Sequence, residues 1–142
     1  MIVVDANVFI RALVGTVVPT DEPLVVAARG LFLAVAAGDE QISTNEAVIA
    51  EVVFILHSPR HIGLARQEVI RRLVPLLGQP GCHFADKNRV LRAFALWIAW
   101  PRVSFVDALT AAQALSTEQP LATFDEALAA LPGLVRWQAA QS

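Results

Sequence analysis

The sequence predicts an α/β fold built on a parallel sheet, and two observations support this prediction. Short apolar runs alternate along the chain with longer segments whose apolar residues recur at helical spacing. This alternation is typical of a parallel sheet flanked by helices. The first run, residues 2–4, is entirely apolar, so we expect it to form a strand that is buried on both faces.

Five strands and seven helices are expected from the apolar runs and from the residues that start and stop helices. The strands are expected at residues 2–4, 41–43, 82–85, 120–124 and 134–137. The helices are expected after residue 5 through 13, and then at about residues 21–37, 43–56, 64–77, 86–100, 104–115 and 125–131. The sequence contains no repeat or linker, so we expect a single domain over residues 1–142.

Composition limits the possible functions. The chain has 142 residues, of which 56% are hydrophobic, and this suits one domain with a substantial core. No apolar run reaches the roughly 18 residues that a membrane helix needs. Cys82 is the only cysteine and the start of the chain lacks a basic region, so we expect a cytoplasmic protein. The formal net charge of −2 argues against bulk electrostatic binding of nucleic acid, leaving local arginines or metal ions to contact phosphate.

Two acidic residues follow expected strands. Asp5 comes directly after residues 2–4, and Asp125 comes directly after residues 120–124. Each could simply cap the helix that follows it, because Asp is a favoured capping residue. The carboxyl ends of parallel strands are also where ligands bind, so a binding role is the alternative.

Glu51 is the least expected of the acids. On a helix its neighbours at i−4, i−3, i+3 and i+4 are Ala47, Val48, Phe54 and Ile55, all apolar. We therefore expect Glu51 to lie on a buried face, where a lone carboxylate would cost several kcal/mol. The simpler interpretation is a buried ion pair with an arginine, and the alternative is a metal ion or a cluster of acids.

Asp107 is the fourth acid of interest. It lies three residues after Ser104, so the two residues could form a capping box with Asp in place of Glu. Taken alone, the capping role is the better interpretation of Asp107.

Together the four acids suggest more than four separate caps. If the first and fourth strands are neighbours, Asp5 and Asp125 emerge at one edge of the sheet, and nearby helices bring Glu51 and Asp107 toward them. Carboxylates packed together repel one another unless cations are present. Oxygen ligands without clustered His or Cys suit Mg²⁺ or Mn²⁺, and such ions promote phosphodiester hydrolysis. The combination indicates a metal-dependent nuclease.

The residues around these acids resemble those of PIN-domain ribonucleases, specifically the VapC-like toxins of bacterial type II toxin–antitoxin pairs. The similarity covers essentially the whole chain, and its order and spacing are more specific than any one piece. It rests on Val3-Val4-Asp5-Ala6-Asn7, Ala50-Glu51-Val52, Phe105-Val106-Asp107-Ala108 and Ala122-Thr123-Phe124-Asp125.

The resemblance implies a PIN-like three-layer sandwich, with a five-stranded parallel sheet between layers of helices. It implies that Asp5, Glu51 and Asp107 hold the main Mg²⁺ or Mn²⁺, directly or through water, and that Asp125 completes the acidic pocket. The implied reaction is endonucleolytic hydrolysis of RNA by metal-activated water, without a covalent intermediate.

The resemblance also implies supporting residues and partners. Asn7 and Thr123 would orient the carboxylates through hydrogen bonds. The implied partners are an RNA substrate and a small cognate antitoxin protein that inserts a basic side chain into the acidic pocket. The resemblance further implies a homodimer.

Other functions remain open at this point. A PIN-type nuclease could process RNA without acting as a toxin. An aspartate-dependent phosphatase-like α/β enzyme would carry a second acid where this chain has Asn7, and a receiver domain would need a lysine nearer the last strand than Lys87, the sole lysine. A non-catalytic binding module is a further alternative, although the presence of all four acids argues against it.

Overall fold

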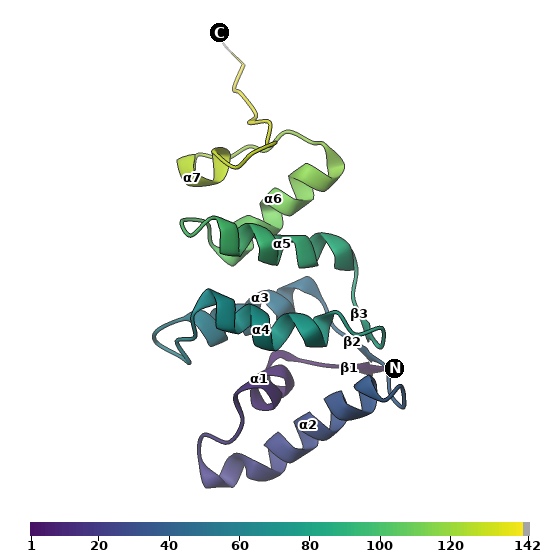
Figure 1. Ribbon diagram of the computed structural model, residues 1–142. Helices are drawn as coiled ribbons and strands as arrows, with labels where there is room; N and C mark the ends of the chain where they lie inside the picture. Colours follow the sequence, from purple (N-terminus) through teal and green to yellow (C-terminus); the bar gives the residue numbers. More distant parts are fainter. Residues whose placement is uncertain (141–142) are drawn as a thin grey trace. The chain divides into compact units, whose positions relative to one another are not determined.

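The computed structural model describes residues 1–140 (Figure 1). The chain forms two compact units, Met1–Lys87 and Asn88–Ser142. In the first unit the elements follow the order expected for an α/β protein, with helices between the strands.

The first unit is a three-stranded parallel sheet with helices in its connections (Figure 1). The strand order is β1-β2-β3, with Ile42 opposite both Ile2 and Cys82. Because parallel strands need long crossovers, helices separate each strand from the next. The elements are β1 (Ile2–Val3), α1 (Ala6–Val14), a 3₁₀ turn (Pro19–Asp21), α2 (Glu22–Ala36), β2 (Ile42–Ser43), α3 (Glu46–His57), α4 (Arg66–Leu77) and β3 (Cys82–His83).

The predicted positions of the strands in this unit are confirmed, but the prediction that residues 2–4 are buried on both faces is wrong. Each of the first three expected strands is present, although each is shorter than expected. Val4 is buried at the end of β1, but Ile2 is 40% and Val3 78% exposed. Within the first unit, β1 pairs with β2.

The core of the first unit lies where helices cover the sheet. Phe9 of α1 is fully buried and its ring lies 5.1 Å from that of Phe32 in α2. Val69 and Leu73 of α4 are also fully buried. These contacts hold α1, which begins directly after β1, in a defined place.

The second unit is mainly helical. It consists of α5 (Lys87–Ala99), whose first residue lies at the unit boundary, α6 (Phe105–Thr117) and α7 (Glu126–Ala129). The ring of Phe105 lies 4.6 Å from Phe94 and 5.7 Å from Trp97. Since all three side chains are buried, they form the centre of this unit's core.

The expectation of five strands is wrong. Within residues 1–140 the structure contains three strands, and the segments expected to form the fourth and fifth make one isolated parallel bridge, Leu121 with Arg136. The backbone N–H of Leu121 donates to Val135 and that of Trp137 donates to Leu121, both at 2.8 Å. Beyond this bridge, the carbonyl oxygen of Thr123 accepts a hydrogen bond from the Arg136 guanidinium, at 3.0 Å.

The helix predictions are confirmed, with ends that shift by a few residues. The same helices bear on the expectation that no apolar run is long enough for a membrane helix. In the part of the chain that the structure describes, none of the helices combines the length and apolar character needed to cross a bilayer.

Candidate functional site

Asp5 lies at the carboxyl end of β1 and caps α1. Its Oδ1 accepts a hydrogen bond from the backbone N–H of Asn7, at 3.1 Å. The side chain is exposed, and Oδ2 makes no hydrogen bond to a residue that the structure describes in this unit. The capping interpretation of Asp5 is therefore correct, and it leaves one carboxylate oxygen available to a ligand. Asn7 contributes its backbone N–H to this arrangement.

Thr44 is a supporting residue that the sequence did not single out. Its hydroxyl donates to the carbonyl oxygen of Val4, at 3.3 Å, and its backbone N–H donates to His83, at 3.0 Å. Thr44 thus ties the ends of all three strands together next to Asp5. Its neighbour Asn45 caps α3 through its side chain.

Glu51 lies in the middle of α3, and the prediction that it lies on a buried face is wrong. The buried residues of α3 are Ile49, Val52, Val53 and Leu56, whereas Glu51 is exposed. The residues of α3 itself are apolar on nearly every side of the helix. The spacing of apolar residues could therefore not identify which face packs inward. Glu51 makes no ion pair or hydrogen bond with a described residue of its unit, so the arginine partner of the ion-pair alternative is not seen there.

Asp107 lies in the first turn of α6. Its backbone N–H donates to the hydroxyl of Ser104, at 3.1 Å, as the capping interpretation expects. The carboxylate is half-buried and is not held in an ion pair by a described residue of its unit. The cap is therefore formed by the Ser104 hydroxyl, and the Asp107 carboxylate remains available.

Asp125 caps α7 in the same way that Asp5 caps α1. Its Oδ1 accepts from the backbone N–H of Leu128, at 3.0 Å. Its own backbone N–H donates to the hydroxyl of Thr123, at 3.0 Å. Thr123 therefore fixes the backbone of Asp125, and the Arg136 guanidinium holds the carbonyl of Thr123.

The four acids are divided equally between the two units: Asp5 and Glu51 in the first, Asp107 and Asp125 in the second. Within residues 1–140, neither unit alone brings together three His, Cys, Asp or Glu side chains that could hold a metal ion. The available donors are carboxylate oxygens without competing cations in their own units. Hard oxygen donors of this kind fit Mg²⁺ or Mn²⁺.

A groove of about 450 Å³ lies beside Asp5, between α1 and α2. Asp5, Asn7 and Arg11 provide its polar atoms, and the rest of its lining is apolar. Arg11 lies 3.6 Å from Asp21 across an ion pair. The apolar lining suits side chains of a protein better than it suits a phosphate backbone.

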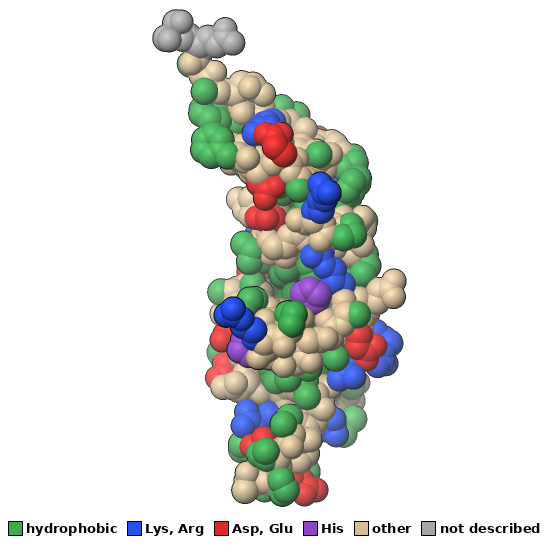
Figure 2. Space-filling model, turned by 90° about the vertical axis from the view of Figure 1, so that its left-hand side faces the viewer, with side chains coloured by type: hydrophobic (Ala, Val, Ile, Leu, Met, Phe, Trp, Pro, Cys, Tyr) green, Lys and Arg blue, Asp and Glu red, His purple; other side chains and the backbone are tan. Residues whose placement is uncertain are grey.

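The described surface does not present a continuous basic patch on the face that Figure 2 shows. Lys and Arg side chains on that face are scattered among acidic and hydrophobic ones. This distribution agrees with the low net charge of the chain.

The profile of the PIN domain family matches residues 2–134. Among curated proteins, none matches the chain. The family match covers nearly the whole sequence, and it includes all four acids. The chain therefore belongs to the PIN domain family, whose fold is that of metal-dependent nucleases.

Proposed function

We propose that this protein is an endoribonuclease that uses Mg²⁺ or Mn²⁺ to hydrolyse RNA phosphodiesters, and that it is the toxin of a toxin–antitoxin pair. The observation that carries the nuclease proposal is the extent of the family match. Residues 2–134 span both units, so acids from both belong to a single family domain. We accordingly propose that residues 1–142 act as one domain in the cytoplasm.

Four carboxylates would hold the cation in this proposal. Asp5, Glu51 and Asp107 would bind it directly or through water, and Asp125 would complete the acidic pocket. When bound, a divalent cation activates water and stabilises the negative charge that develops on a phosphodiester. The role of the chain is to orient the oxygens: Asn7 fixes Oδ1 of Asp5, and Thr123 fixes the backbone at Asp125.

The toxin role is supported by the resemblance to VapC-like proteins and by the groove beside Asp5. An apolar groove with a carboxylate at its rim fits a partner that presents apolar side chains and one basic side chain. A small antitoxin of this chemistry would cover Asp5 and block the site. A homodimer is proposed from the same resemblance. The exposed apolar side chains of α2, among them Val26 and Leu33, provide an additional surface on which a partner could pack.

Cleavage of RNA by the purified protein tests the nuclease proposal. We expect cleavage with Mg²⁺ or Mn²⁺ and none in EDTA. Glu51→Gln is the sharpest variant, because Glu51 is exposed and has no described partner in its unit, so its loss costs the fold little. We expect this variant to lower the cleavage rate about a hundredfold or more.

Asp39→Asn is the matched control, because Asp39 is an exposed acid in the loop after α2. It should cleave like the wild type. Cleavage that persists in EDTA, or full activity of Glu51→Gln, would contradict the metal mechanism. Growth arrest on expression, relieved by a co-expressed antitoxin, supports the toxin role, whereas cleavage without growth arrest indicates RNA processing.

A further inference from the structure

The carboxyl end of α1 is held by side chains from two other helices. The last carbonyls of any α-helix lack partners within the helix. In α1 the backbone N–H of Gly15, at a φ of 87°, donates to the carbonyl of Arg11 at 3.1 Å. The next two carbonyls, those of Ala12 and Leu13, are each taken by an arginine.

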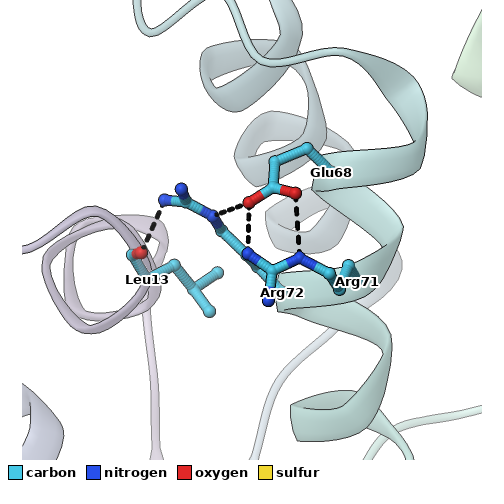
Figure 3. A network of polar contacts seen from close by, with 4 residues as sticks. All are labelled: Leu13, Glu68, Arg71 and Arg72. Atoms are coloured by element: carbon cyan, nitrogen blue, oxygen red, sulfur yellow. Dashed lines mark hydrogen bonds and ion pairs between the residues drawn. The ribbon is translucent and has the colours of Figure 1, made fainter.

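Arg29 of α2 and Arg72 of α4 are these arginines. Nε of Arg29 donates to the carbonyl of Ala12, at 3.1 Å. Nη1 of Arg72 donates to the carbonyl of Leu13, also at 3.1 Å, and Figure 3 shows its guanidinium reaching across to α1. Two cations at a helix carboxyl terminus also interact favourably with the helix dipole.

The Arg72 guanidinium is itself held in position. Oε1 of Glu68 accepts from Nε of Arg72 at 2.7 Å (Figure 3). The hydrogen bonds from Arg71 and Arg72 lower the pKa of Glu68 to about 2, so Glu68 stays ionised at neutral pH. Arg29 fits because residue 15 is glycine: a Cβ there would lie 2.8 Å from Nη2 of Arg29.

The hydrogen bonds from Arg29 and Arg72 act on the carboxyl end of α1, and Asp5 lies at the amino end of the same helix. With nine residues, α1 is about 13 Å long, short enough to move as a rigid rod. The buried Phe9 already packs α1 against Phe32 of α2. The hydrogen bonds of Arg29 and Arg72 to adjacent carbonyls, from two different helices, add a constraint at the carboxyl end of α1.

We infer that Arg29 and Arg72 are positioning residues for the metal site, because they fix the orientation of α1 and thereby the place of Asp5. This inference rests on the proposed function, since it requires that Asp5 binds the cation. Neither arginine touches the cation, and both act through the backbone of α1.

Titration of the full chain with Mn²⁺, followed by calorimetry, tests the inference. The variants are Arg29→Gln and Arg72→Gln. Arg71→Gln is the matched control, since Arg71 also binds Glu68 but makes no hydrogen bond to α1. We expect the Mn²⁺ affinity to fall about three- to tenfold in the first two variants and to stay unchanged in the control.

The sign of the effect separates positioning from simple electrostatics. Removal of a positive charge by itself strengthens the binding of a cation, so a weaker affinity cannot come from the lost charge. Arg72→Lys, which retains a donor for the Leu13 carbonyl, should recover part of the affinity.

Circular dichroism at the titration temperature checks that every variant is folded, so that affinities are compared between folded proteins. Wild-type protein that binds Mn²⁺ and cleaves RNA, with Arg29→Gln and Arg72→Gln matching Arg71→Gln, would overturn the positioning role alone. Wild-type protein that neither binds Mn²⁺ nor cleaves RNA would overturn the proposed function and the positioning role with it.

Discussion

Asp5 in the first unit and Asp125 in the second each cap a helix, but the segments that precede them are held in different ways. The segment before Asp5 is strand β1, which pairs with β2 and is tied to it again by the Thr44 hydroxyl. The segment before Asp125 makes one bridge, and its Thr123 carbonyl is bound by the side chain of Arg136. The first acid is therefore supported by a sheet, and the second by a single guanidinium.

This difference shows how far hydrogen bonds from a side chain can take the place of strand pairing. Arg136 fixes the backbone of Thr123 and also lies 3.0 Å from Glu126 in an ion pair. Asp125 is thus positioned by one bridge and by side-chain hydrogen bonds and not by a strand ladder.

The largest expected effects come from the two cores. Phe9→Ala in the first unit and Phe105→Ala in the second each remove a large buried ring, which should cost about 3–5 kcal/mol of unfolding free energy. If residues 1–142 form one domain, either variant lowers the same cooperative transition. Urea unfolding measures both changes.

The positions of the tryptophans allow unfolding of the second unit to be followed separately from unfolding of the whole chain. Trp97, Trp100 and Trp137 all lie in the second unit, so their fluorescence reports that unit, whereas circular dichroism reports every helix. We expect Phe9→Ala to shift the fluorescence transition. A shift in circular dichroism without one in fluorescence would mean that the units unfold separately and would contradict a single domain.

A smaller effect is expected when the two capping acids are changed. Asp5→Asn and Asp125→Asn each remove a carboxylate charge, and each should lower RNA cleavage, by about a hundredfold for Asp5 and by less for Asp125. Asn caps helices about as well as Asp, so the melting temperature should change little. Cleavage rates and thermal melts of both variants provide the measurement. Loss of folding along with activity in either variant would mean that the acid serves mainly as a cap.

The smallest effect concerns pH and is confined to the first unit. Hydrogen bonds from Arg71 and Arg72 lower the pKa of Glu68 from 4.5 to about 2. A carboxyl whose pKa is lower in the folded state adds stability above about pH 4.5, and that stability is lost as the pH falls toward 2. Glu68 is well solvated, so the contribution is modest.

Glu68→Gln should therefore be less stable than the wild type at pH 7, and the difference should shrink between pH 4.5 and pH 2. Urea unfolding across this range measures it, with Asp39→Asn as the control. A difference that stays constant with pH would show that the ion pairs of Glu68 do not contribute to stability.

The helices could be predicted well from the sequence, because their starts and stops are local. Ser104 and Asp125, for example, cap their helices as predicted. Burial was harder to predict. Glu51 was expected on a buried face, but α3 is apolar on most sides, and only packing decides which of those sides faces the core.

The strands were predicted in place for the first unit and not for the second. A strand depends on a partner distant in sequence, and local composition does not report competing hydrogen bonds. The bond from Arg136 to the Thr123 carbonyl is one such competitor. The candidate acids were found because acids after apolar runs are unusual, whereas Thr44, Arg29 and Arg72 act through the backbone and leave no such signal.

Anomalous diffraction from crystals soaked with Mn²⁺ tests the central claim most directly. We predict an Mn²⁺ peak that is contacted by carboxylates of both units, with Asp5 and Glu51 on one side and Asp107 on the other. An ion bound by the acids of one unit alone, with those of the other unit remote from it, would contradict the claim that the two units share one metal site.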